Sequence, residues 1–154
     1  MSGKDRMADE GEQEYLSQYH PEDYASISIT VDAIVVGVAK NSTDNYRKLD
    51  RQSLKILLVK REHYPYKGYY GLPGGFVGTK ETFEDTLKRV LSDKTGLLDV
   101  YSEQLYTFGS VDRDPRMRIV SCAYISLVDI SKASITGAQW FALEEIAGME
   151  LAFD

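Results

Sequence analysis

Hydrophobic residues recur along this chain in short apolar runs that are rich in β-branched side chains. Such runs are typical of strands that are largely buried in a sheet. The long ones are separated by polar or turn-forming segments, so each run predicts its own strand. The predicted strands are 28–39, 54–60, 105–108, 118–128 and 138–141.

A different spacing in the middle of the chain predicts a helix. Phe83, Leu87 and Leu91 recur at every fourth position, which places them on one face of a helix. Thr82 is a suitable N-cap and Gly96 a suitable C-terminal stop. With strands in the majority, the fold class is mixed α/β. The predicted helices are 82–95 and, near the end of the chain, 142–147.

The remaining segments predict one domain with an N-terminal extension. The chain has 154 residues, enough for one domain with a sizeable core. Residues 1–25 are polar and acidic and predict a flexible tail, in which 12–19 form at most a short helix. The domain is therefore 26–154. Residues 41–53 predict a long surface loop, and the cluster 72–75 a turn with unusual backbone angles.

Composition narrows the class of protein. Hydrophobic residues make up 43% of the chain, as in globular proteins, and the net charge of −6 gives no general attraction for nucleic acid. No apolar run is long enough to cross a membrane. Cys122 is alone and lies in an apolar run, which predicts a small buried side chain in a reducing compartment. These features predict a cytoplasmic protein.

Six residues between positions 75 and 97 stand at the spacing of a known signature, the Nudix box. The resemblance implies a Nudix-type α/β/α sandwich with a mixed β-sheet. It also implies Mg²⁺-dependent hydrolysis of a nucleoside diphosphate derivative, provided that the carboxylates of the box are present. The matching residues are Gly75, Glu81, Arg89, Leu91, Gly96 and Leu97.

Three glutamates of the family's box are replaced in this chain, and only one of the replacements keeps a carboxylate. Val90, Asp93 and Lys94 stand where the family has glutamates. These positions share one side of the helix, and Mg²⁺ requires oxygen ligands. Val90 has no ligand atom and Lys94 brings a positive charge, so no residue of the box is a confident catalytic residue and metal-dependent hydrolysis is expected to be weak or absent. The remaining weak candidates for a metal site are Glu81, Glu84 and Asp93.

Two basic residues of the box each have two interpretations. Lys94 is either a solvated helix lysine or a direct partner for a diphosphate, in place of a metal ion. Arg89 either pairs with Asp85 one helical turn earlier or, as the resemblance implies, orients the preceding loop through a buried ion pair.

A second cluster of basic residues follows the helix. Arg113, Arg116 and Arg118 occur close together inside an acidic chain. Guanidinium groups on one loop suit the recognition of phosphate or carboxylate. The alternative is a hairpin whose arginines pair with Asp112 and Asp114.

Three short segments give a narrower resemblance. LPGGFV at 72–77, DRDPR at 112–116 and LAFD at 151–154 are together similar to Nudix-related transcriptional regulators of NAD metabolism and their sugar-responsive relatives. The resemblance covers 29–154. It implies an N-terminal domain that binds ADP-ribose or another small effector, in a dimeric protein whose DNA-binding winged helix follows the LAFD segment. We therefore expect the winged helix to be absent from this chain.

The leading hypothesis is a catalytically degenerate effector-binding domain of a transcriptional regulator. It needs no cofactor, forms a homodimer and does not bind DNA or membranes by itself. One alternative is a Mg²⁺-dependent Nudix hydrolase acting on ADP-ribose or a related compound, and another is a scaffold without a ligand. The expected ligand-binding residues are Tyr70, Gly74, Gly75, Phe76, Lys94, Arg113 and Arg116.

Overall fold

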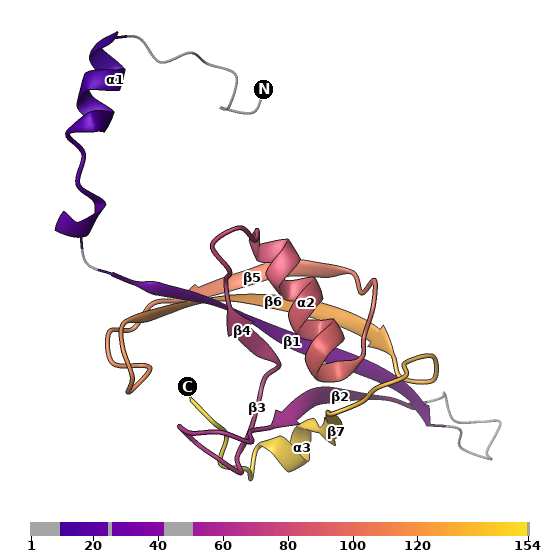
Figure 1. The fold of residues 1–154 in the computed structure, drawn as a ribbon. Coiled ribbons are helices and arrows are strands. Elements are labelled where there is room, and N and C mark those ends of the chain that lie inside the picture. Colours follow the sequence, from indigo (N-terminus) through magenta and orange to yellow (C-terminus); the bar gives the residue numbers. More distant parts are fainter. Residues whose placement is uncertain (1–9, 25, 42–50, 154) are drawn as a thin grey trace.

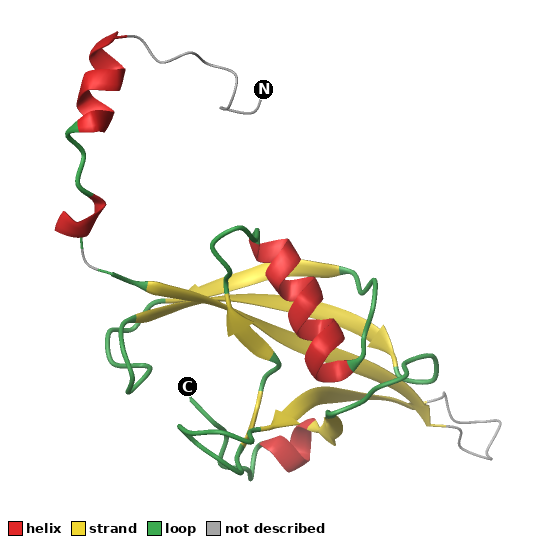
Figure 2. Cartoon of the chain, viewed as in Figure 1, coloured by secondary structure: helices red, strands yellow, loops and turns green. Residues whose placement is uncertain are grey.

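The computed structural model describes residues 10–24, 26–41 and 51–153. The first residues of the predicted tail and most of the predicted loop 41–53 lie outside them. A long helix packs on a mixed sheet, with shorter elements around both (Figures 1 and 2). The elements are α1 (Glu10–Ser17), the 3-10 helix η1 (Pro21–Asp23), β1 (Ser28–Asn41), β2 (Arg51–Lys60), β3 (Tyr70–Gly71), β4 (Gly74–Phe76), α2 (Phe83–Thr95), β5 (Ser102–Phe108), β6 (Ile119–Asp129), β7 (Gln139–Ala142) and α3 (Leu143–Ile146).

Strand β1 organises the sheet, whose strand order is β3-β2-β1-β6-β5. It pairs in parallel with β6 along most of its length and antiparallel with β2 over its second half. Its first half pairs antiparallel with β4, which places Gly74 opposite Asp32 and Phe76 opposite Thr30. The start of the box motif therefore lies in a strand of the sheet, shortly before α2.

The core lies between β1 and α2. Val31, Ala33 and Val35, which alternate along β1, are fully buried and pack with Leu87 and Leu91 of the helix. Figure 1 shows α2 lying across this face of the sheet. Burying each large apolar side chain contributes about 1.5–3 kcal/mol. The four-residue spacing of the sequence thus identified the buried face of the helix correctly.

Helix α2 begins and ends as predicted. The Thr82 hydroxyl accepts a hydrogen bond from the Asp85 amide, and the Asp85 carboxylate accepts one from the Thr82 amide, which completes a capping box. At the other end Gly96 adopts a left-handed backbone with φ of 73°, which favours glycine. Both ends of the helix are therefore set by local sequence.

Strand β5 begins three residues before the predicted strand 105–108. Its pairing with β6 shifts register between Gln104 and Tyr106. Such an irregularity breaks the alternation of apolar and polar residues that identifies a strand. β5 is also an edge strand whose residues are mostly exposed, so burial imposes little pattern on its sequence.

Helical elements outside α2 are short. α1 buries no residue and lies away from the sheet in Figure 1, while α3 packs on β7 and β2. The predicted helix 12–19 is thus present, although it occupies Glu10–Ser17. The mixed seven-stranded sheet and its helices match the predicted Nudix-type α/β class.

Two further predictions concern burial and membranes. Cys122 is only 2% exposed, which confirms the small buried side chain, and burial raises the pKa of its thiol. Within the described residues, no helix has the length and apolar character needed to span a bilayer.

Candidate functional site

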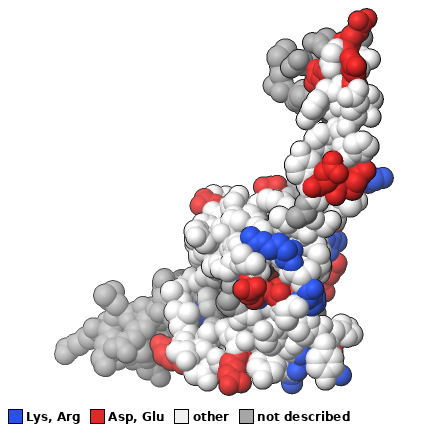
Figure 3. Space-filling view, turned by 90° about the vertical axis from the view of Figure 1, so that its left-hand side faces the viewer, with Lys and Arg blue, Asp and Glu red and all other residues white. Residues whose placement is uncertain are grey.

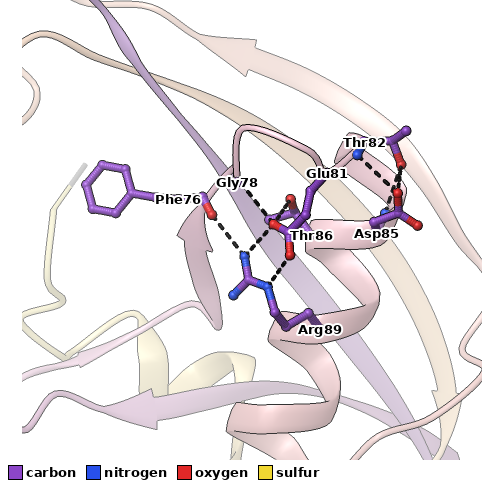
Figure 4. Close-up of polar contacts among 7 residues, drawn as sticks. All are labelled: Phe76, Gly78, Glu81, Thr82, Asp85, Thr86 and Arg89. Atoms are coloured by element: carbon purple, nitrogen blue, oxygen red, sulfur yellow. Dashed lines mark hydrogen bonds and ion pairs between the residues drawn. The ribbon is translucent and has the colours of Figure 1, made fainter.

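Glu81 is the centre of a hydrogen-bond network that ties the loop after β4 to helix α2 (Figure 4). Arg89 donates from Nε to one carboxylate oxygen at 2.6 Å and from Nη2 to the other at 2.8 Å. The second oxygen also accepts from the Gly78 amide at 3.0 Å and from the Thr86 hydroxyl at 2.9 Å. Arg89 Nη2 further donates to the Phe76 carbonyl at 3.0 Å. One carboxylate and one guanidinium therefore fix the loop geometry.

This network decides between the two interpretations of Arg89. Pairing with Asp85 is wrong, because Asp85 is engaged in the helix cap. The pair with Glu81 is present but is not buried, since the side chains of Arg89 and Glu81 are 42% and 27% exposed. Hydrogen bonds from Arg89, the Gly78 amide and Thr86 lower the pKa of Glu81 to about 2, so this carboxylate is ionised throughout the physiological range.

Gly74 and Gly75 are required for space rather than for backbone angle, which corrects the expectation from sequence. Both lie in β4 and neither has a positive φ. A Cβ atom on Gly74 would collide with the Asp32 side chain, and one on Gly75 would lie 2.9 Å from Cγ2 of Val90. The glycines therefore allow β4 to approach β1 and α2 closely.

The replaced box positions do not fit the family's metal site. Val90 is 1% exposed and fills the space below Gly75. Lys94 donates from its ammonium to the Gly74 carbonyl, while Asp93 is exposed on the helix surface. Among the described residues there is no group of three His, Cys, Asp or Glu side chains arranged to hold a metal ion. An apolar side chain and an ammonium are not oxygen ligands for Mg²⁺.

The three weaker metal candidates are not brought together. Glu81 is occupied by Arg89 and its neighbours, whereas Glu84 accepts a hydrogen bond from the Tyr124 hydroxyl of β6 at 3.2 Å. Glu84 and Tyr124 line a cavity of about 510 Å³ between α2 and the segment that includes Leu98 and Val100. Glu84 therefore lies on a different face of α2 from Asp93.

Lys94 is exposed on the helix, as one interpretation predicted, but its ammonium also has a protein partner. It donates to the Gly74 carbonyl. Burial lowers the pKa of Lys94, the positive charges of Arg61 and Arg89 lower it further, and Asp32 opposes them. An ammonium held against other cations is a favourable place for an anion.

Arg61, just after β2, belongs to the same positive region and was not identified from sequence. Its guanidinium Nε donates to the Pro65 carbonyl at 2.9 Å. Burial lowers its pKa first, then the charge of Arg116, while Asp114 and Asp32 raise it. We call Arg61, Lys94 and Arg116 the cationic cluster. They come from three distant segments, which is why no local pattern reveals them together.

The Arg116 side chain is held between Asp114 and Phe76. It forms a bidentate pair with Asp114, from Nε at 2.9 Å and from Nη2 at 2.8 Å, as the hairpin alternative predicted. Its guanidinium also lies over the Phe76 ring, 5.4 Å from the centroid. Hydrogen bonding to Asp114 raises the pKa of Arg116, so this group is fixed and charged beside the box loop.

The other two arginines of that motif differ in their surroundings. Arg113 is partly buried and its charge helps to lower the pKa of Asp114. Arg118 donates to the Ser110 carbonyl at 2.7 Å and so closes the loop.

Asp32 is a further residue that sequence reasoning missed. It lies in β1 on the face opposite the core and accepts hydrogen bonds from Thr30 at 3.2 Å and from Ser121. Its charge acts on both Lys94 and Arg61. The alternation of buried and partly buried residues along β1 could have placed it on this face, but not beside Gly74.

Tyr70 contacts β7 rather than the arginines. Its hydroxyl donates to Gln139 at 3.2 Å, and its ring packs edge-on against Phe141 with centroids 4.8 Å apart. Of the expected ligand-binding residues, Gly74, Phe76, Lys94 and Arg116 are thus grouped together by direct contacts.

Comparisons with known proteins agree with this geometry. The family model for the NUDIX domain matches residues 43–154. The chain is 34% identical to the "ADPR responsive transcriptional repressor NtrR" of Acinetobacter baylyi, over 93% of this chain and 56% of that protein. It is 37% identical to an "ADP-ribose pyrophosphatase" of Methanocaldococcus jannaschii, over 65% of this chain and 60% of that protein. The chain therefore spans little more than half the length of these relatives.

A solved structure extends the likeness to three dimensions. The NUDIX domain of Shewanella oneidensis NrtR, crystallised with ADP ribose, superposes with a TM-score of 0.73 at 35% identity, covering 93% of this chain and 90% of that one. The family match, the fold and the Gly75–Glu81–Arg89 geometry lead to one conclusion: the chain belongs to the Nudix family.

Proposed function

We propose that this chain is an effector-binding domain that recognises a phosphorylated metabolite, with ADP-ribose as the first candidate, without a divalent metal. The observation that carries the proposal is the placement of the Lys94 ammonium on the Gly74 carbonyl, beside Arg61. Lys94 occupies a box position where the family has a glutamate. A fixed ammonium there supplies positive charge to a diphosphate directly.

The chemistry of the cationic cluster supports an anionic ligand. Charge-assisted hydrogen bonds from guanidinium and ammonium groups to phosphate are among the stronger polar contacts in proteins. Lys94 has three N–H donors, of which Gly74 accepts one. Asp32 and Asp114 act on the cluster, but three cations face two carboxylates. The surplus of positive charge favours an anionic ligand.

The identity of the ligand is supported by the relatives. One is described as ADPR responsive, and another was crystallised with ADP ribose. Together they make ADP-ribose the first compound to test and a regulator the favoured role. We also propose that the domain acts as a homodimer, which light scattering of the purified chain tests directly.

We propose that DNA recognition by such a regulator is carried outside these 154 residues. The net charge is −6, and Figure 3 shows basic and acidic side chains interspersed on the face in view rather than a continuous basic area. Clustered basic side chains supply most non-specific affinity for DNA. A mobility-shift experiment with this chain should therefore show no tight complex at physiological salt.

Calorimetry with ADP-ribose tests the proposal, once with Mg²⁺ and once with a chelator. We expect binding of equal affinity in both conditions. Product analysis after incubation with Mg²⁺ or Mn²⁺ should show negligible hydrolysis. Turnover of about 1 per second or more, or binding that requires metal, would contradict the proposal.

A metal-dependent ADP-ribose hydrolase is the second candidate, favoured by the 37% identity to a pyrophosphatase. Val90 and Lys94 weigh against it because neither supplies an oxygen ligand. If the scaffold tolerates both changes, replacing Val90 and Lys94 with glutamate in one variant should introduce metal-dependent hydrolysis. The unchanged chain supplies the baseline for that assay.

A further inference from the structure

The segment Leu151–Phe153 docks directly beside the candidate site. Leu151 forms a parallel bridge with Tyr70 of β3, and the Ala152 amide donates to the Tyr70 carbonyl at 2.8 Å. Ala152 is 8% exposed. A Cβ atom added to Gly71 would lie 3.4 Å from the Cβ atom of Ala152. Figure 1 shows this yellow part of the chain close to β3. The segment therefore packs closely on β3.

In the docked segment, the Phe153 ring lies beside the cationic cluster. The ring centroid is 4.8 Å from the guanidinium carbon of Arg61 and 5.9 Å from that of Arg116. Tyr66 meets the same ring edge-on, with centroids 4.8 Å apart. Phe153 and Tyr66 both have a left-handed backbone, with φ of 67° and 60°, which is unusual for aromatic residues. Tertiary contacts therefore hold both residues in place.

The negative face of an aromatic ring attracts a cation. Phe153 lies within reach of both guanidinium groups, so one ring contacts two members of the cationic cluster. A guanidinium that stacks by its flat face keeps its N–H groups at its edge. Those edge N–H groups are the ones that bind phosphate.

We propose that Phe153 is a positioning residue that aligns Arg61 and Arg116 for the anionic part of the ligand, and that ligand binding in turn stabilises the docked segment Leu151–Phe153. The proposal rests on the function proposed above, and it adds a residue and a linkage that the function itself does not require. Because coupling between two events is reciprocal, whatever strengthens docking of Phe153 also strengthens binding of the anion.

The first test compares ADP-ribose binding by variants of the whole chain. Phe153→Leu keeps an apolar side chain but removes the ring, and should weaken binding about threefold to thirtyfold. Phe153→Tyr keeps the ring and should bind within about twofold of the unchanged protein. Phe108→Leu is the matched control, because Phe108 lies on the edge strand β5 and contacts Tyr106. Equal affinity of Phe153→Leu and the unchanged chain would overturn the inference.

A double-mutant cycle asks whether Phe153 acts through Arg61. Arg61→Met removes the charge while keeping a long side chain. If Phe153 aligns Arg61, the effect of Phe153→Leu should shrink in the Arg61→Met background. The inference would be overturned if the effects of Phe153→Leu and Arg61→Met on affinity simply added and Phe153→Tyr also lost ADP-ribose binding. That result would show that Phe153 has a structural role only.

Hydrogen exchange of the Ala152 amide tests the reciprocal half. ADP-ribose should slow exchange of this amide in the unchanged protein and not in Phe153→Leu. Binding of ADP-ribose without any change at Ala152 would overturn the linkage while leaving the proposed function intact. If the unchanged chain fails to bind ADP-ribose, the proposed function fails and the inference fails with it.

Discussion

The Glu81–Arg89 network and the cationic cluster both contact strand β4, yet they are built differently. The network takes its members from one continuous segment and matches one carboxylate with one guanidinium. The cluster brings Arg61, Lys94 and Arg116 together from three distant parts of the chain. Local sequence therefore contains all members of the first region, whereas the members of the second are brought together only by the fold.

The two regions also differ in how their charge is satisfied. Glu81 accepts hydrogen bonds from Arg89, the Gly78 amide and Thr86, and this satisfied carboxylate fixes the loop. In the cluster, burial and then a neighbouring cation lower the pKa of Arg61 and of Lys94. Perturbed groups of like charge are frequent at functional sites. We therefore propose a structural role for the network and a ligand-binding role for the cluster. Each role can be tested separately.

Reversing the charge of Lys94 should have the largest effect. In Lys94→Glu a charge-assisted bond to the ligand is lost and a repulsive carboxylate is added, so ADP-ribose should bind at least about 100-fold more weakly. Calorimetry at constant salt measures the change. Lys88→Glu is the matched control, because Lys88 is exposed on the same helix and lines the cavity on its other face. An equal loss in both variants would mean that only net charge matters.

Removing Arg116 should weaken binding less than that reversal. Arg116→Ala is expected to cost about 1.5–3 kcal/mol of binding free energy, the range for a hydrogen bond to a charged group. Arg118→Ala should leave the affinity unchanged, since Arg118 bonds to the Ser110 carbonyl. If Arg113→Ala and Arg116→Ala both bind normally, the arginine motif is a structural hairpin.

Glu81→Gln should alter stability and its dependence on pH. The folded pKa of Glu81 is about 2, below its ordinary value of 4.5. A depressed pKa contributes stability that is fully present above pH 4.5 and is lost as pH falls toward 2. The variant should therefore have a lower urea midpoint than the unchanged chain at neutral pH, and the difference should narrow below pH 4.5. Fluorescence of Trp140, the single tryptophan, reports unfolding.

A constant difference at all pH values would contradict the charge-based account of Glu81. ADP-ribose affinity of the folded variant near neutral pH supplies the second readout. Under the proposed function it should change less than in Lys94→Glu, because Glu81 bonds to the loop and to α2.

Thr86→Val should have the smallest effect. Thr86 is fully buried and donates to Glu81 at 2.9 Å, so removing its hydroxyl should lower the free energy of unfolding by about 1–2 kcal/mol. Ligand affinity should not change. Thr95→Val is a useful comparison, because Thr95 is equally buried but bonds to the Leu91 carbonyl within the helix. Loss of ADP-ribose binding in Thr86→Val would contradict the proposal that the network and the cluster have separate roles.

Sequence by itself determined the elements and the family. Apolar runs located the long strands, and the spacing of Phe83, Leu87 and Leu91 located the helix and its buried face. The caps at Thr82 and Gly96 followed from residue type. These features depend on interactions between near neighbours in the chain, so a linear pattern contains them.

Only the tertiary structure decided how the box and its surroundings work. Sequence suggested unusual backbone angles at Gly74 and Gly75, whereas the structure requires close approach to Asp32 and Val90. It also left Lys94 without a partner, which the fold supplies in the Gly74 carbonyl. Residue spacing does not report contacts across a sheet or between loops.

The same limit explains why Arg61 and Phe153 were not identified from sequence as site residues. One follows β2 and the other lies close to the end of the chain, and they meet because the C-terminal segment pairs with β3. Electrostatic and cation–π interactions depend on distance in space, whatever the separation in sequence. The box sequence therefore identified the fold, whereas contacts between distant segments decided which cations lie close together in it.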